Sequence, residues 1–204
     1  MTGTNILAVD IGGTHVKFRT NRHKVHQSFD SGADMTPAVM MSSLAEHTKG
    51  WKYDKVSLGY PGPVANHRPS LEPHNLAPGW TKFDFAKAFK KPVRMMNDAA
   101  MQALGSYKGG RMLFLGLGTG LGSALVLDGL VQPLELAHLG WRKNKTYEEY
   151  LGLGALQRDG KKKWRKNVDH ALEALLAAFL VDYIVLGGGN AKRIDDAPKY
   201  VTIG

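Results

Sequence analysis

Two glycine-rich turns in this chain carry residue types suited to holding phosphate groups. The first, Asp10-Ile-Gly-Gly-Thr14, follows an apolar run and combines two glycines with a hydroxyl and a carboxylate. Gly12 and Gly13 let backbone N–H groups approach a phosphate closely, and Thr14 adds a hydroxyl donor. Asp10 is expected at the end of a strand, where it would hold a hydrated Mg²⁺ that neutralises phosphate charge.

The second turn lies in LGLGTGLGS, residues 115–123, where four glycines alternate with other residues. A dinucleotide fingerprint needs GxGxxG between a strand and a helix, but the segment that follows here is rich in Leu and Val and ends at Asp128-Gly129, as a hairpin does. We therefore expect a strand, a turn and a second strand. Gly118, Thr119 and Gly120 would line this turn and contact phosphate.

Asn97 and Asp98 stand at a predicted strand-to-helix junction in RMMNDAA, residues 94–100. Both residue types are preferred helix N-caps, so one interpretation is structural. The other is chemical: Asp98 would take the proton from an attacking hydroxyl group, and Asn97 would fix the orientation of that hydroxyl. The two residues alone favour neither interpretation.

A second polar group follows in the second half of the chain. Glu135 and His138 are three residues apart, so on a helical turn both reach one face and can bind adjacent polyol hydroxyls. A metal site at His138 lacks a second His or Cys at ligand spacing. Glu148 begins an apolar helical stretch, where it would either complement the helix dipole or offer another carboxylate to a ligand. Beside phosphate turns, this set suits a sugar and a phosphoryl donor.

The elements that position these residues repeat along the chain. Residues 5–19 and 112–128 share one plan: an apolar strand, a glycine-rich turn with a threonine, and a second strand. Each half later reaches an apolar strand that ends in small residues, KVSLGYPG in the first and DYIVLGGG in the second. We predict a pseudo-duplicated α/β protein with lobes at 1–108 and 109–204, whose two turns would clamp a phosphate chain.

The chain has 204 residues, no cysteine and a formal net charge of +9. The absence of cysteine excludes disulfide scaffolds, Cys-ligated zinc and thiol nucleophiles, and it fits a reducing cytoplasm. The longest apolar run, residues 174–181, is too short to span a bilayer, so we expect a cytoplasmic protein with no membrane partner. Basic runs at 161–166, 87–91 and 142–145 are either solvated faces or an electrostatic path for phosphate chains or nucleic acid.

Eight segments in chain order resemble the family of repressors, open reading frames and sugar kinases, the ROK family. They are DIGGTHVK, GYPGPV, HNLAPGW, MNDAA, LGLGTGLGSALV, ELAH, EEYLGLGAL and IVLGGGNAKR. The resemblance implies the two-lobed, ribonuclease H-like fold of actin, hexokinase and the heat-shock chaperone ATPases. It also implies a kinase that transfers a phosphoryl group from ATP or polyphosphate to the 6-hydroxyl of glucose or a related hexose, with Mg²⁺, as a homodimer.

The resemblance assigns roles to individual residues. Asp98 would be the catalytic base. Sugar hydroxyls would be bound by Asn75, Asn97, Glu135, His138 and Glu148. The donor would be bound by Asp10, Gly12, Gly13, Thr14, Lys17, Gly118, Thr119, Gly120 and Gly188, with Asp10 holding Mg²⁺ through water.

Within the family the chain is most similar to polyphosphate glucokinases, through Lys17 and the segment QRDGKKKW. The Cys-rich zinc loop of many members is replaced by residues 139–147, which contain no cysteine, so no zinc is expected. The chain ends at Gly204, 15 residues after Gly189, where relatives continue through another strand and a closing helix. Either the sequence is truncated, or the adenine side of the donor site is reduced, and a reduced site would favour polyphosphate over ATP.

Two other classes of function are weighed against the kinase. Part of this family represses transcription, so a non-catalytic sugar-sensing regulator is the main alternative. Such regulators resemble this chain plus an N-terminal helix-turn-helix, for which the expected first strand at Asn5 leaves no room. A nucleic-acid binder would rest on net charge alone, since no recognised binding module is present, and nucleic acid is therefore not an expected partner.

Overall fold

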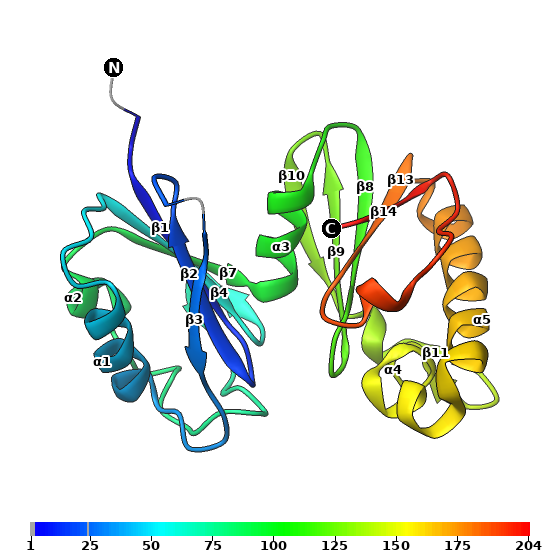
Figure 1. Ribbon diagram of the computed structural model, residues 1–204, viewed down its shortest axis with the longest axis horizontal. Helices are drawn as coiled ribbons and strands as arrows, with labels where there is room; N and C mark the ends of the chain where they lie inside the picture. The colour runs from blue at the N-terminus through cyan, green and yellow to red at the C-terminus, as the bar shows by residue number, and fades with distance from the viewer. Residues whose placement is uncertain (1–2, 24) are drawn as a thin grey trace. The chain divides into compact units, whose positions relative to one another are not determined.

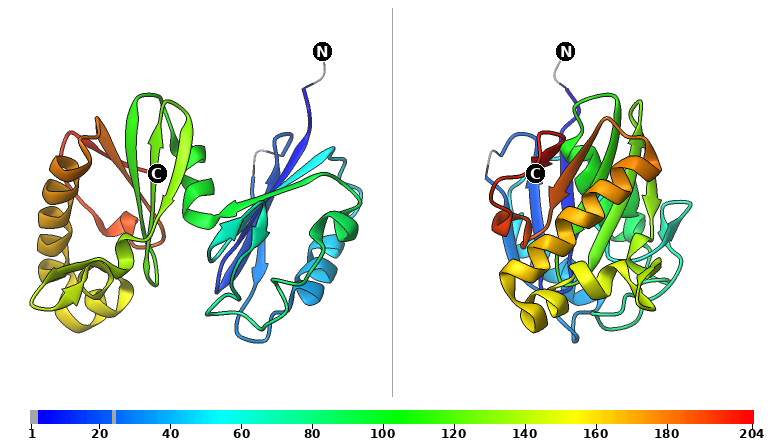
Figure 2. Two further views of the ribbon diagram at one scale, coloured as in Figure 1. Left: turned by 180° about the vertical axis from the view of Figure 1, so that it is seen from behind. Right: turned by 90° about the vertical axis from the view of Figure 1, so that its right-hand side faces the viewer.

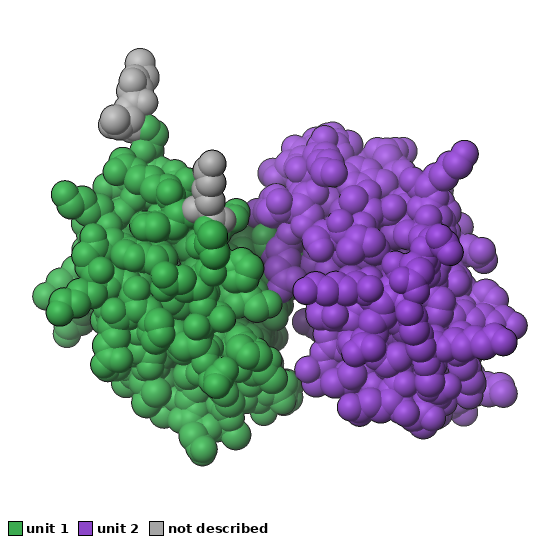
Figure 3. All heavy atoms as spheres, in the orientation of Figure 1, with its two compact units in different colours: residues 1–101 green, residues 102–204 purple. Residues whose placement is uncertain are grey.

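The computed structural model of the chain describes residues 3–23 and 25–204. The chain divides into two compact units, Met1–Met101 and Gln102–Gly204, which Figure 3 shows in different colours. The division falls inside helix α3 (Asp98–Ser106), whereas the sequence places it after Lys108, where that helix has ended. Each unit has its own hydrophobic core.

The first unit is built on a five-stranded sheet with the order β3-β2-β1-β4-β7. Its strands are β1 (Ile6–Ile11), β2 (His15–Thr20), β3 (Gln27–Asp30), β4 (Lys55–Tyr60) and β7 (Val93–Asn97). Helices α1 (Pro37–His47) and α2 (Phe85–Phe89) cover one face, as Figure 1 shows. Because side chains alternate along a strand, β1 buries Leu7, Val9 and Ile11 under these helices and presents Asp10 on the other face.

The second unit repeats this plan with the order β10-β9-β8-β13-β14. Its strands are β8 (Arg111–Leu117), β9 (Leu121–Leu127), β10 (Leu130–Leu134), β13 (Tyr183–Gly187) and β14 (Val201–Ile203). Helix α5 (Leu153–Phe179) covers one face of the sheet, as the two views of Figure 2 show. It is broken at Gly160, which adopts φ 77°.

The two sheets have the same topology, which confirms the predicted duplication. In each, the first three strands in sequence are antiparallel neighbours, and the last two are added parallel to the first. A further strand, which was not predicted from the sequence, follows the glycines at 187–189. β14 pairs in parallel with β13, and its three residues are too few to show a periodic pattern in the sequence.

Short elements complete the second unit and the edge of the first. They are β5 (Val64–Ala65), β6 (Arg68–Pro69), η1 (Leu136–His138), β11 (Gly140–Arg142), β12 (Lys145–Thr146), α4 (Tyr147–Leu151) and η2 (Ala191–Arg193). Lys143 and Asn144, both at positive φ, turn the chain between β11 and β12. Within residues 3–23 and 25–204, no helix has the length and apolar character needed to cross a membrane.

Candidate active site

Asp10 and Asp98 lie close together in the first unit, on either side of Gly59. Asp10 pairs in register with Gly59 across the parallel strands β1 and β4, and Asp98 opens α3 directly after the neighbouring strand β7. A Cβ added at Gly59 would lie 3.2 Å from Asp10 Oδ1 and 3.4 Å from the Asp98 Cα. Glycine at this position therefore leaves the space that the two acidic residues need, a role that sequence reasoning missed although GYPG marks small residues at this strand end.

The Asp10 carboxylate lies in an environment that mixes burial with nearby positive charge. Lys17 is its partner across β1 and β2, and both residues line a cavity of about 250 Å³ together with Arg19 and His26. Burial raises the pKa of the Asp10 carboxyl, and the positive charge of Lys17 opposes that effect. No group of three His, Asp or Glu side chains among the described residues could form a ready-made metal cage. A cation here would therefore depend on Asp10, water and the phosphates of a ligand, which is the arrangement that Mg²⁺ accepts.

The first glycine turn is held tightly by its own backbone. The N–H of Gly12 donates to the carbonyl of His15 at 3.0 Å, and a Cβ added at Gly12 would lie 2.9 Å from that oxygen. A Cβ added at Gly13 would lie 2.9 Å from the Cβ of Asn75, so the predicted sugar-binding residue Asn75 is placed against the turn. Thr14 is exposed beside them.

Glu72 organises the loop that carries Asn75. It forms a hydrogen bond with the Thr81 hydroxyl and accepts backbone N–H groups of Gly79, Trp80 and Thr81. These bonds lower the pKa of Glu72, and the bond with the Thr81 hydroxyl has the largest effect. Burial acts in the opposite direction. The indole of Trp80 is fully buried and donates to the Ala77 carbonyl. The loop thus has a fixed shape, and that shape brings Asn75 to Gly13.

Asn97 caps helix α3. Its Oδ1 accepts the N–H of Ala100 at 3.2 Å, and its Nδ2 donates to the carbonyl of Gly62 at 3.4 Å. The half-buried Asp98 follows, and its Oδ1 accepts the N–H of Ala99 at 2.7 Å. The capping interpretation is therefore correct for Asn97, and the cap fixes the backbone from which Asp98 projects.

The second glycine turn is bonded to the predicted sugar-binding residue Glu148. Glu148 Oε2 accepts the N–H of Leu121 at 3.0 Å, and a Cβ added at Gly120 would lie 2.3 Å from that oxygen. The N–H of Gly118 is engaged within the turn, with the carbonyls of Gly116 and Gly120 each at 3.1 Å. Thr119 is the exposed residue of the turn.

A second contact to this turn comes from the segment after β13. Gly188 adopts φ 81°, and a Cβ there would lie 2.6 Å from the Leu117 carbonyl oxygen, so both conformation and space require glycine. Asn190 donates its Nδ2 to the Gly118 carbonyl at 3.0 Å and its N–H to Leu117 at 2.9 Å. Sequence reasoning missed Asn190, although it directly follows the three glycines.

Glu135 and His138 lie on one side of the 3-10 turn η1, as their spacing predicts. Glu135 Oε2 is 3.9 Å from His138 Nε2, and the side chains are 66% and 78% exposed. The carbonyl of Leu139 accepts the N–H of Tyr147 at 3.0 Å. This bond joins the residue after His138 to the residue before Glu148. Because α4 also packs against η1 and β9, the second unit gathers all three polar residues near the second turn.

The basic run at 161–166 is partly neutralised by acidic side chains. Lys161 pairs with Asp195 at 2.7 Å, Lys163 with Asp159 at 3.3 Å, and Arg165 with Asp169 at 2.9 Å. These pairs reduce the charge that the run can offer to a polyanion, and they favour the interpretation of the run as a solvated helix face.

Residues 6–133 match the sequence profile of the ROK family. Kanosamine kinase from Amycolatopsis mediterranei is 30% identical over 145 residues, 62% of this chain and 47% of that protein. Polyphosphate glucokinase from Mycobacterium tuberculosis is 26% identical over 175 residues, 78% of this chain and 66% of that protein. The chain thus spans less than two thirds of the length of these relatives.

Solved structures show the same fold. The crystal structure of inorganic polyphosphate/ATP-glucomannokinase from an Arthrobacter species superposes with a TM-score of 0.80 at 22% identity, covering 98% of this chain and 90% of that one. This likeness establishes the two-lobed α/β fold of the actin and hexokinase class. The match to the family profile extends over more than half of the sequence, and the chain therefore belongs to the ROK family.

Proposed function

We propose that this chain is a sugar kinase that transfers a phosphoryl group from ATP or polyphosphate to the 6-hydroxyl of glucose or a related hexose. The observation that carries the proposal is the placement of Asp10 and Asp98 on either side of Gly59. Phosphoryl transfer needs a base at the attacking hydroxyl and positive charge at the donor phosphates. Asp98 serves the first need, and Lys17, together with a Mg²⁺ ion that Asp10 would hold through water, serves the second.

The acceptor sugar is bound through its hydroxyls. Asp98 takes the proton of the attacking hydroxyl, and the capping bond of Asn97 holds the junction that presents it. The exposed Glu135 carboxylate accepts hydrogen bonds from sugar hydroxyls. A ring nitrogen of the exposed His138 donates to a hydroxyl or accepts from one, according to its tautomer. The proposed sugar-binding residues are Asn75, Asn97, Glu135, His138 and Glu148.

The donor is bound by the two glycine turns. The proposed contacts are Asp10, Gly12, Gly13, Thr14, Lys17, Gly118, Thr119, Gly120 and Gly188. Since the N–H groups of Gly12 and Gly118 are engaged inside their turns, the hydroxyls of exposed Thr14 and Thr119 are the main contacts there. Mg²⁺, when bound through Asp10 and water, would neutralise part of the donor charge.

A product assay tests this function. The full chain is incubated with glucose, mannose, kanosamine and other hexoses, each with ATP and with polyphosphate, and sugar phosphates are detected by mass spectrometry. We expect a 6-phosphate from at least one sugar with at least one donor. A chain that binds a sugar in calorimetry but forms no product with either donor would be the sensing regulator instead, and the kinase proposal would be wrong.

The family resemblance also leads us to propose a homodimer located in the cytoplasm. The chain has a mass of 22.3 kDa. Sedimentation velocity should therefore give a species of about twice that mass, whereas a monomer at micromolar concentration would contradict the proposed assembly.

A further inference from the structure

Helix α4 carries Glu148 but is too short to hold its own position. It has five residues, Tyr147–Leu151, and isolated helices of this length are unstable in water. Its N-terminus is closed by a capping box, in which the Thr146 N–H donates to Glu149 Oε2 at 2.8 Å and the Glu149 N–H donates to Thr146 Oγ1 at 3.3 Å. Its C-terminus needs partners for the last carbonyl groups.

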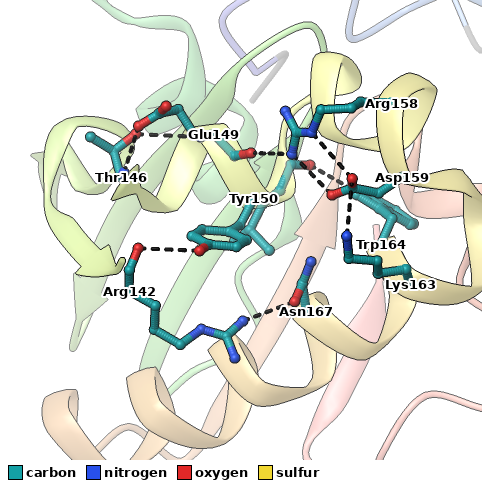
Figure 4. Close-up of polar contacts among 10 residues, drawn as sticks. Arg142, Thr146, Glu149, Tyr150, Arg158, Asp159, Lys163, Trp164 and Asn167 are labelled. Carbon is teal, nitrogen blue, oxygen red and sulfur yellow. Dashed lines mark hydrogen bonds and ion pairs between the residues drawn. The ribbon is translucent and has the colours of Figure 1, made fainter. Parts of the chain in front are cut away.

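Two side chains of α5 supply those partners, as Figure 4 shows. The indole Nε1 of Trp164 donates to the carbonyl of Leu151 at 2.8 Å, and Arg158 Nη2 donates to the carbonyl of Glu149 at 3.0 Å. Trp164 is fully buried, and its bond is buried with it. Two carbonyls in the last turn of α4, those of Glu149 and Leu151, are thus bonded to one neighbouring segment.

That segment is QRDGKKKW, and its other residues hold Arg158 in place. Asp159 accepts from Arg158 Nε at 3.2 Å and from Nη2 at 2.9 Å, and it also pairs with Lys163 at 3.3 Å. Gly160 adopts φ 77°, which lets α5 break between Arg158 and Trp164 so that both reach α4. The local contacts explain the Arg, Asp, Gly and Trp of this segment without a ligand.

On this basis, we propose that Arg158 and Trp164 are positioning residues that fix α4, so that the Glu148 carboxylate stays on the second glycine turn. The contact that they protect is the bond from Leu121 to Glu148 Oε2 at 3.0 Å. Its effect on catalysis rests on the proposed function, in which Glu148 binds sugar. The segment then acts through α4 and makes no contact of its own with the phosphoryl donor.

The first test is hydrogen exchange of residues 146–153 in the full chain. Arg158→Met and Trp164→Phe should each raise exchange in this segment about tenfold, because each leaves a helix-terminal carbonyl without its donor. Lys162→Met is the matched control, since it removes a positive charge from the same exposed run. It should leave exchange unchanged. Arg158 is exposed, so Arg158→Met keeps the test available if Trp164→Phe fails to fold.

The second test is a double-mutant cycle on kcat/KM for the sugar. In the wild-type chain, Arg158→Met should lower kcat/KM about tenfold. In the Glu148→Gln variant, the same change should lower kcat/KM by less than about twofold, because both substitutions disturb one contact. The proposal would be overturned if hydrogen exchange stayed unchanged in both Arg158→Met and Trp164→Phe. It would also be overturned if the losses in kcat/KM from Arg158→Met and Glu148→Gln were additive and Lys162→Met lowered kcat/KM as much as Arg158→Met, which would indicate a direct electrostatic role. If the wild type phosphorylates no sugar, the proposed function fails. The hydrogen-exchange comparison still decides whether Arg158 and Trp164 fix α4.

Discussion

The carboxylate of Glu148 accepts the backbone N–H of Leu121 at 3.0 Å, and the same oxygen would lie 2.3 Å from a Cβ at Gly120. One side chain proposed to bind sugar is therefore bonded to the turn proposed to hold the donor. Movement of the turn and movement of α4 are linked through this bond. The glycine at 120 has a spatial role here, since it makes room for a carboxylate.

Gly120→Ala should lower kcat/KM about a hundredfold, because the added methyl group must displace the Glu148 carboxylate by about an ångström. Steady-state kinetics with saturating donor would measure the loss. Gly154→Ala is the control, since a Cβ there meets nothing within 4 Å. It lies in α5, so it should keep full activity and gain up to about 1 kcal/mol of stability. A Gly120→Ala protein as active as wild type would show that the contact is dispensable.

Gly59→Ala should disturb both acidic residues of the first unit. The added Cβ would lie 3.1 Å from Met101 Sδ, 3.2 Å from Asp10 Oδ1 and 3.4 Å from the Asp98 Cα. We expect a loss of about 1–3 kcal/mol in unfolding free energy from overpacking, and at least about a tenfold fall in kcat. Gly105 lies in α3, the helix that carries Asp98 and Met101, and a Cβ at Gly105 meets nothing within 4 Å, so Gly105→Ala should retain activity. Equal kinetics for the two variants would contradict this spatial role.

Asp10→Asn should make the protein more stable at neutral pH while impairing catalysis. Burial raises the pKa of the Asp10 carboxyl above 3.8, with Lys17 opposing. At a pH between the pKa of Asp10 in the unfolded chain and its higher pKa in the folded chain, the folded chain binds more protons than the unfolded chain. The free energy of unfolding therefore falls as pH rises. Asparagine does not titrate and avoids this fall. Scanning calorimetry should show a higher Tm for the variant at about pH 7 and a difference that disappears as pH approaches about 4. A higher Tm for the wild type than for Asp10→Asn at neutral pH would contradict this prediction.

The duplicated hairpins were predictable because they rest on local patterns. Apolar alternation predicts β8 and β9, and the Asp128-Gly129 turn, with φ 48° and 83°, ends β9 without distant contacts, whereas β10 beyond that turn was not predicted. β14 was missed because three residues carry no period. The hairpin between β11 and β12 was missed because its turn residues, Lys143 and Asn144, are not the usual glycine pair.

The candidate site was predictable in its residue types but only partly in its contacts. Gly59 and Asn190 act on residues far away in sequence, so the local glycine patterns around them do not reveal which side chains or carbonyls they contact. The same holds for Glu148, whose place at the start of an apolar helical stretch indicated either a helix-dipole charge or a carboxylate for a ligand, but not its bond to Leu121. Such contacts depend on how strands, turns and helices pack against one another, which spacing alone does not determine.

The central claim, that Asp98 is the base of a sugar kinase, is tested most directly by the kcat of Asp98→Asn. Asparagine is nearly isosteric, and the Asn97 cap on Ala100 stays in place, so the fold should be retained. We predict a fall in kcat of about a thousandfold with the sugar KM changed less than about threefold, as expected when a general base is removed. An Asp98→Asn protein that phosphorylates its sugar as fast as wild type would contradict the account.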